Sequence, residues 1–263
     1  GVELFNIIIW YTGNYVTVNN NHFFCSGKTA DAVIVSPDIY PESKKFFDEN
    51  NIDIIYSFEN KSVDERLAYH ADMQITRVGY NDYVCIPEAH DYYHEKLSKY
   101  GANIIKGDTY LTSNYPNYIA YNIIVTESYA VHNFKFTDTA VKQFIASKKQ
   151  INVSQGYSSC SCCAIKDGVF ITSDTGICNS LISNGLSVLK INCGDIKLPG
   201  YDYGFFGGSC GKISDDILAV NGNLSNHPDY NEIISFCKYY NVNTVSLSDN
   251  PIFDIGSLIP VFM

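Results

Sequence analysis

Short apolar runs alternate with amphipathic segments along this chain, and the alternation repeats five times. The first copy, AVIVSPDIYPESKKFFDENNIDIIYS from Ala32, reads as a β-run, a polar turn, an amphipathic helix and a second β-run. Further copies begin at Asp82, Ser128, Gly168 and Asp216. Their spacing of roughly 40 to 50 residues is typical of repeat arrays and propellers. The pattern therefore predicts one supersecondary unit used five times.

The predicted helices have recognisable ends. Asn51, Gly101, Gly185 and Asn241 follow four of them, and Asn and Gly are the residues that tolerate the left-handed conformation of a helix exit. Four copies also have a β-run upstream: MQITRV, IAYNIIVT, CSCCAI and GKI. The predicted unit is therefore β-β-α-β.

One helix per unit covers only one face of its sheet, so the other face must be buried against neighbouring units. Five units that close around an axis achieve this. We therefore expect a single α/β domain, 1–263, in the form of a five-fold pseudosymmetric β/α propeller. The approximate units are 14–60, 61–112, 113–155, 156–200 and 201–263. The alternative is a three-layer doubly wound α/β sandwich, but that fold predicts uniform β-α alternation, and the chain has no early glycine-rich phosphate loop.

Charge and composition narrow the functional classes. The net charge of −10 and the lack of a Lys/Arg cluster argue against nucleic acid and anionic membranes as partners. No run approaches the length of about 18 apolar residues that spans a bilayer. The opening GVELFNIIIWYTGNY lacks the basic start and cleavage site of a signal peptide, and the nine cysteines are scattered. We expect reduced thiols and a cytoplasmic protein.

The architecture and several short motifs resemble the pentein fold of guanidino-group-modifying enzymes, which include dimethylarginine hydrolases, deiminases and amidinotransferases. YHADMQITRVGYNDYVCIP is similar to the segment in which an acidic residue faces the guanidinium, a position that Asp72 takes. GGSCGKISDDILAVNGNLSN is similar to a second such segment, and FDIGSLIPVF to the closing strand. The set HADMQ, QGYSSCS, LPGYDYGFFGG, HPDY and DIGSLIP resembles most an uncharacterised family of this fold.

The chain departs from the resemblance at two positions that matter for chemistry. Penteins of known activity carry a nucleophilic cysteine in the closing strand, where this chain has Ser257. They also carry an acid/base histidine before the fourth unit, where INVSQGYSSC offers Gln155 and Tyr157. The resemblance therefore implies a substrate pocket without fixing its activity.

Three residues are the candidates for catalysis. Cys210 lies among glycines in GGSCG, where a bare backbone lets another group approach, but the sequence places no activating base next to it. Cys160, in the CSCC stretch and near Tyr157 and Gln155, is an alternative nucleophile. His227 is an acid/base candidate. For each residue a structural role is the competing interpretation: core filling for the thiols and helix capping for His227.

The candidates for ligand binding are polar residues at predicted strand starts and β-α loops. On a strand, His70, Asp72 and Gln74 would share one face and suit a cationic amine or guanidinium. The other candidates are Gln155, Asp174, Gly208, Asp229 and Asp254. Capping and turn formation are the competing interpretations for Asp174, Asp229 and Asp254.

We expect neither a metal nor a cofactor. CSCC gives at most two ligands on one face, and the pair His90 and His94 lacks an evident third ligand. Two functions stay open. The first is a C–N bond hydrolase or amidinotransferase-like enzyme for a small guanidino, amidino or amide compound. The second is a non-catalytic protein that binds a small cationic or zwitterionic molecule in the same pocket. The sequence leaves open whether the protein is an enzyme and how many chains assemble.

Overall fold

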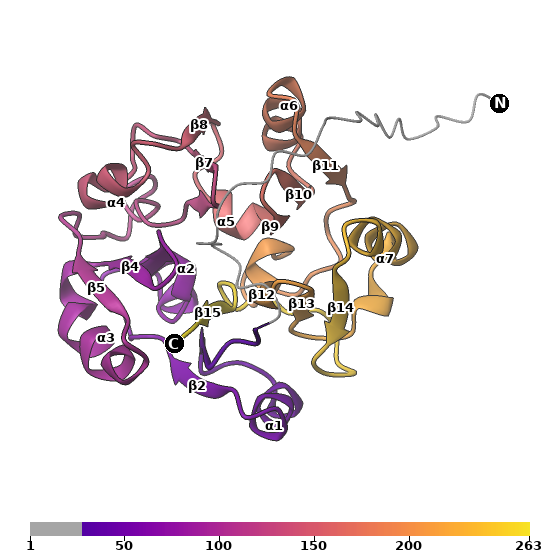
Figure 1. Ribbon diagram of the computed structural model, residues 1–263, viewed down its shortest axis with the longest axis horizontal. Helices are drawn as coiled ribbons and strands as arrows, with labels where there is room; N and C mark the ends of the chain where they lie inside the picture. Colours follow the sequence, from indigo (N-terminus) through magenta and orange to yellow (C-terminus); the bar gives the residue numbers. More distant parts are fainter. Residues whose placement is uncertain (1–27) are drawn as a thin grey trace.

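Five three-stranded sheets are arranged around a common axis in a computed structural model that describes residues 28–263 (Figure 1). The colours follow the chain once around the ring, with one sheet after another. The doubly wound alternative was therefore wrong, because no sheet has more than three strands in the described part of the chain. The predicted start of the first unit, residue 14, lies outside the described residues.

Each sheet has the same order, with an inner, a middle and an outer strand. In the first sheet these are β15 (Ile259–Val261), β1 (Ala32–Val35) and β2 (Asp53–Tyr56). The second and third sheets are β3 (Ile75–Arg77), β4 (Asp82–Cys85), β5 (Asn103–Lys106) and β6 (Ile124–Val125), β7 (Tyr129–His132), β8 (Lys149–Asn152). The fourth and fifth are β9 (Cys162–Lys166), β10 (Val169–Thr172), β11 (Ser187–Lys190) and β12 (Cys210–Ser214), β13 (Ile217–Val220), β14 (Asn243–Ser246). The inner strand pairs antiparallel with the middle strand, which pairs parallel with the outer one.

A helix joins the middle to the outer strand of every sheet, as a parallel pair requires. These helices are α1 (Pro41–Glu49), α3 (His90–Leu97), α4 (Thr139–Phe144), α6 (Thr175–Ser183) and α7 (Tyr230–Tyr239), and they form the rim of the ring (Figure 1). All four predicted exits have positive φ: Asn51 at 55°, Gly101 at 67°, Gly185 at 79° and Asn241 at 56°. The β-β-α-β unit is thus confirmed. None of the described helices is long and apolar enough to cross a membrane.

Two further helices, α2 (Ala71–Gln74) and α5 (Ser158–Ser161), are single turns near the axis (Figure 1). Short 3₁₀ helices occupy Glu65–Leu67, Pro87–Ala89, Ser98–Tyr100, Gly207–Ser209 and Leu224–Asn226. The turns α2, α5 and Gly207–Ser209 each end directly before an inner strand. They place polar side chains on the axis.

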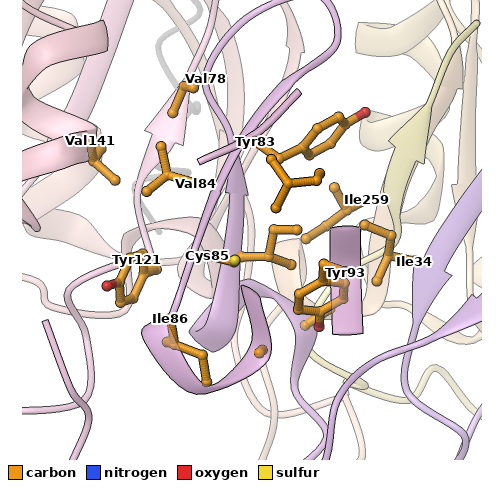
Figure 2. Packing of buried hydrophobic residues seen from close by; sticks show 14 of the residues in the cluster. Ile34, Val78, Tyr83, Val84, Cys85, Ile86, Tyr93, Tyr121, Val141 and Ile259 are labelled. Atoms are coloured by element: carbon orange, nitrogen blue, oxygen red, sulfur yellow. The ribbon is translucent and has the colours of Figure 1, made fainter. Parts of the chain in front are cut away.

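The units bury apolar surface against one another. Figure 2 shows part of the largest cluster, in which Tyr83 and Cys85 of β4 lie near Ile34 of β1 and Ile259 of β15. Tyr93 of α3 belongs to the same cluster. Because the cluster spans the first three units, no one unit could bury these residues alone. The sheets are therefore fixed in relation to each other, and so is the centre of the ring.

Candidate functional site

The inner strands begin at the same end of the axis, and the turns before them meet there. The turn Ala71–Gln74 contacts the closing turn, because Asp72 N donates to the carbonyl oxygen of Gly256 over 3.0 Å. The turn Ser158–Ser161 contacts the third unit, because Ser159 N donates to Asn122 Oδ1 over 2.9 Å. Segments far apart in sequence thus converge at one point.

Asp72, Asn122, Cys160 and Ser257 form what we call the axial cluster. Cys160 Sγ donates to Asp72 Oδ2 over 3.0 Å and accepts from Asn122 Nδ2 over 3.0 Å. Ser257 Oγ lies 2.6 Å from Asp72 Oδ2 and 3.0 Å from the carbonyl oxygen of Gly207. All four residues are at most 7% exposed. A carboxylate, a thiol, an amide and a hydroxyl therefore share one buried hydrogen-bonded group.

Two features of the axial cluster are costly for the fold. Asp72 Oδ1 is buried and has no hydrogen-bond partner among the described residues. Ser257 has a φ of 70°, a left-handed conformation that non-glycine residues rarely adopt. Unsatisfied polar atoms and strained backbone persist where the surrounding structure enforces them, and they concentrate at functional sites.

A cavity of about 280 Å³, the aromatic cavity, adjoins the axial cluster. Cys160 and Met73 line it on the axial side. Tyr157, Tyr203 and Phe205 are among the aromatic residues that line it. Of the cysteines in the described residues, only Cys160 lines this cavity.

Asp254 and His70 complete the aromatic cavity. Asp254 Oδ1 accepts from Gly256 N over 3.0 Å, and Oδ2 accepts from Phe205 N over 2.8 Å. Burial raises the pKa of the Asp254 carboxyl, which is 1% exposed, while the nearby His70 opposes the rise. His70 Nδ1 lies 4.0 Å from Asp254 Oδ1.

Glycines make this close packing possible. A Cβ on Gly208 would lie 2.1 Å from Asp254 Oδ1, and one on Gly256 would lie 2.4 Å from Cα of His70. Gly256 also has a φ of 73°. No larger residue fits at either position without moving the carboxylate or the imidazole.

A second hollow, the strand cavity, lies along the inner strands and has a volume of about 140 Å³. Asp72 and Ser257 line it, so the axial cluster borders both hollows. Its other polar lining includes Thr76, Arg77 and Lys212. Burial lowers the pKa of Lys212 to about 8. Lys212 Nζ donates to the carbonyl oxygens of Ile165 and Asp215.

Five of the sequence-predicted site residues meet at this end of the axis: His70, Asp72, Cys160, Gly208 and Asp254. The expectation that His70, Asp72 and Gln74 share a strand face was wrong, because residues 71–74 form a helical turn. Gln74 points away from the site. Its Nε2 donates to the carbonyl oxygens of Phe58 and Ala68, and its Oε1 accepts from Tyr93.

The CSCC stretch also differs from the expected strand. Cys160 lies in the turn α5, and β9 begins only at Cys162, so the two thiols do not share a strand face. Burial raises the pKa of the Cys160 thiol well above its usual value, and the charge of Asp72 adds to the rise.

Cys210 occupies the first position of β12 and is 2% exposed. It packs in an apolar cluster with Phe206 and Leu218. Burial raises the pKa of its thiol well above the usual value. Cys210 lines the strand cavity and not the aromatic one, an environment that suits core filling.

The remaining predicted residues cap and brace the β-α loops. Asp174 Oδ1 caps α6 by accepting from Ile177 N over 2.7 Å, and Gln155 Nε2 donates to Asp174 Oδ2 over 3.0 Å. His227 Nδ1 accepts from Asp229 N over 3.1 Å, and burial lowers the pKa of His227.

Asp229 binds the loop that follows β11, because its Oδ1 accepts from Asn192 Nδ2 over 2.7 Å. None of Gln155, Asp174, His227 and Asp229 lines the aromatic cavity. Within residues 28–263, no group of three His, Cys, Asp or Glu side chains is arranged to hold a metal ion.

Sequence reasoning missed Asn122 as a site residue. It lies in IAYNIIVT, which reads as a plain β-run, and only its contact with Cys160 reveals its place. The aromatic walls had a visible signal in GYDYGFF, where tyrosines and phenylalanines cluster beside glycines. That cluster supplies Tyr201, Tyr203 and Phe205 to the cavity.

Solved structures with the same ring define the class. Agmatine deiminase from C. jejuni, a cysteine-to-serine variant with substrate bound, is 11% identical with a TM-score of 0.56, covering 96% of this chain and 99% of that one. An amidinotransferase of the saxitoxin pathway from Microseira wollei is 10% identical, with a TM-score of 0.50 and coverage of 88% and 91%. DDAH from Pseudomonas aeruginosa, a cysteine-to-serine variant complexed with citrulline, is 6% identical, with a TM-score of 0.50 and coverage of 84% and 93%. The protein therefore has the pentein β/α-propeller fold, as predicted.

The sequence also assigns a family. A model of a family of unknown function, DUF6873, matches residues 34–259, so the chain belongs to that family. No curated protein matches it in sequence. The identities to the solved structures are low enough that they establish the fold alone.

Proposed function

We propose that the protein binds a small guanidino, amidino or amide compound in the aromatic cavity and cleaves one of its C–N bonds, with Cys160 as the nucleophile. The observation that supports this proposal most is the position of Cys160. Its thiol lies between the aromatic cavity and a buried carboxylate that accepts its hydrogen bond. The solved pentein structures with a deiminase or amidinotransferase name are consistent with this class of ligand.

The axial cluster suggests how the thiol becomes reactive. Asp72 Oδ2 already accepts a hydrogen bond from the thiol, and Asn122 Nδ2 would stabilise a thiolate by donating to it. A cationic ligand beside the sulfur favours the thiolate electrostatically. The S–C bond then forms as the C–N bond breaks, and Asp72 returns the proton to the departing amine. Water hydrolyses the S–C bond and restores the thiol.

In this proposal Asp254 and His70 bind and orient the ligand. Asp254 is fixed by two backbone N–H groups, so its carboxylate is pre-positioned for a cation. His70 lies beside it.

The cytoplasmic location of the protein stays a prediction.

A second candidate function is binding without turnover. The observation that favours it is the raised pKa of the buried Cys160 thiol, which disfavours the nucleophilic form. In this case the axial cluster would serve only to shape the pocket.

The test is to incubate the purified protein with a panel of guanidines, amidines and ureas. Ammonia or amine release and thermal stabilisation are measured together. The enzyme proposal predicts that Cys160→Ala lowers the rate of release by a factor on the order of 1000 or more, because the nucleophile is lost. Cys193→Ser, at an exposed cysteine, is the control and should keep full activity. Stabilisation without release supports the second candidate, and neither effect with any compound would exclude both.

A further inference from the structure

The walls of the aromatic cavity are a continuous belt of rings. The ring centroids of Tyr157 and Phe205 lie 6.3 Å apart, and those of Phe205 and Tyr203 lie 6.2 Å apart. Tyr118 and Tyr115 extend the belt, with centroids 5.9 Å and 5.8 Å from that of Tyr157. Ring faces attract desolvated cations, and rings also pack against apolar groups.

The charged residues that line this cavity are acidic. Asp202 and Asp254 line it together with His70, and no Lys or Arg of the described residues does. A ligand carboxylate in this space would have no cationic partner. It would lose its hydration and face two carboxyl groups, at a cost that ring contacts do not recover.

Two basic residues line a hollow that shares part of its wall with the aromatic cavity. This outer cavity, of about 380 Å³, shares His70, Leu198 and Asp254 with the aromatic cavity and is also lined by Arg66 and Lys197.

Arg66 is already engaged. Its Nε and Nη2 donate to the two carboxylate oxygens of Asp64, and Nη1 donates to the carbonyl oxygen of Gly200 over 2.9 Å. Its guanidinium also stacks on Tyr201, 4.6 Å from the ring centroid. Arg66 thus fastens the loop that carries Tyr201, Asp202 and Tyr203 and is not available to a ligand.

Lys197 is exposed and does not line the aromatic cavity. Its Nζ lies 6.0 Å from the ring centroid of Phe253. The outer cavity that it lines also holds the carboxylates of Asp38 and Glu65. An anion that reached Lys197 would meet these carboxylates as well.

We propose that the ligand of the aromatic cavity is a guanidinium or related cation on an apolar or aromatic stem, without a carboxylate. An α-amino acid such as arginine is a poor ligand, and its decarboxylated counterpart is a good one. This inference rests on the proposed function for the cationic head group and adds the chemistry of the rest of the molecule.

The test compares pairs of compounds that differ by one carboxylate. Agmatine is paired with arginine, and 2-phenylethylguanidine with N-amidinophenylalanine, and binding of each is measured by calorimetry at pH 7. We expect the carboxylate-free member of each pair to bind at least tenfold more tightly. Equal or tighter binding of the carboxylate-bearing member would overturn the inference while leaving the proposed function standing. If no compound of either pair binds, a guanidinium head group is not recognised and the inference fails, whereas the wider panel of amidines and ureas decides the proposed function.

A charge reversal on the cavity wall sharpens the test. Asp202→Lys places a cation in the lining of the aromatic cavity. It should reduce at least fivefold the ratio of affinities between the carboxylate-free and the carboxylate-bearing compound of each pair. Asp48→Lys makes the same change on the exposed face of α1 and should leave the preference unaltered. An equal effect of the two substitutions would show that net charge, and not the cavity lining, sets the preference, and would overturn the inference.

Discussion

The two hollows that the axial cluster borders are built from different kinds of structure. The aromatic cavity is lined by turns and loops, which supply tyrosines, Phe205 and the carboxyl groups of Asp202 and Asp254. The strand cavity is lined mainly by the inner strands, with many aliphatic side chains and the cations Arg77 and Lys212. The ring is thus acidic and aromatic before its inner strands begin and basic along them.

This difference shows where a repeated fold can vary. The inner strands must keep their pairing and pack against neighbours, which restricts most positions to small or apolar side chains. The turns before them have no such ladder to maintain, so each can present a different group to the axis. Asp72, Asn122 and Cys160 come from three of these turns.

The largest expected effect comes from removing the carboxylate that organises the aromatic side. Asp254→Ala leaves the buried N–H groups of Phe205 and Gly256 without their acceptor. At 1 to 3 kcal/mol for each lost partner, we expect the free energy of unfolding to fall by about 4 kcal/mol. Urea denaturation measures the change, and Asp202→Ala, at an exposed carboxylate, should shift stability by less than about 0.5 kcal/mol. A loss below about 1 kcal/mol would mean that Asp254 does not organise this side.

The next effect concerns the charge on the strand side. Burial lowers the pKa of Lys212 to about 8 from 10.5, so between these pH values the unfolded chain binds more protons than the folded one. The penalty for burying the ammonium is therefore complete below pH 8 and is relieved as the pH rises towards 10.5. We expect the stability of Lys212→Met relative to the unaltered protein to be higher at pH 7 than at pH 10 by about 2 kcal/mol. A pH-independent difference would show that Lys212 is not destabilised by burial.

Ligand affinity should change when a side chain of the aromatic cavity is altered and should not change when one of the strand cavity is altered. Phe205→Ala removes a ring from the aromatic belt and should weaken binding of a cationic ligand about tenfold, which corresponds to about 1.4 kcal/mol. Thr76→Leu places a larger side chain in the strand cavity and should change the dissociation constant of the same ligand less than twofold. Calorimetry with 2-phenylethylguanidine measures both. A reversed order of the two effects would place the ligand in the strand cavity.

The smallest expected effect is on the belt itself. Tyr118 OH and Tyr157 OH are 2.5 Å apart, and Tyr118→Phe removes this hydrogen bond while keeping the ring. We expect a stability loss of about 1 kcal/mol by urea denaturation, with little change in affinity, because the belt keeps its rings. Tyr110→Phe, at an exposed tyrosine between β5 and β6, should change neither quantity. A tenfold loss of affinity in Tyr118→Phe would show that the hydroxyl pair holds the belt in place.

The ring could be predicted from the sequence because its information is local. Repeated β-runs, helix spacing and the exits Asn51, Gly101, Gly185 and Asn241 each act within a few residues, and the structure confirms them. Asp72 could also be found, because YHADMQ resembles the pentein segment in which an acidic residue faces the guanidinium. Local pattern therefore carried the fold and part of the site.

Other parts of the site depend on contacts that no local pattern records. The turns α2 and α5 look like strand beginnings in sequence, so Gln74 was expected beside Asp72, and Cys160 was expected on one strand face with Cys162. Asn122 joins the site only because two units meet. Cys210 drew attention through its glycines, and one of them, Gly208, does shape the site by packing against Asp254. Gly256, which packs against His70, had no such signal.

The strand that completes the first sheet, β15, comes from the far end of the chain and pairs with β1, Ala32 opposite Val261. During synthesis, the inner edge of β1 therefore stays unpaired until β15 has left the ribosome. A circular permutant that begins near Asp249 would carry this strand ahead of β1 and should close the ring earlier, because the chain that separates the two paired strands becomes much shorter. Removal of the last few residues would instead leave a ring whose inner edge is open to pairing with another chain.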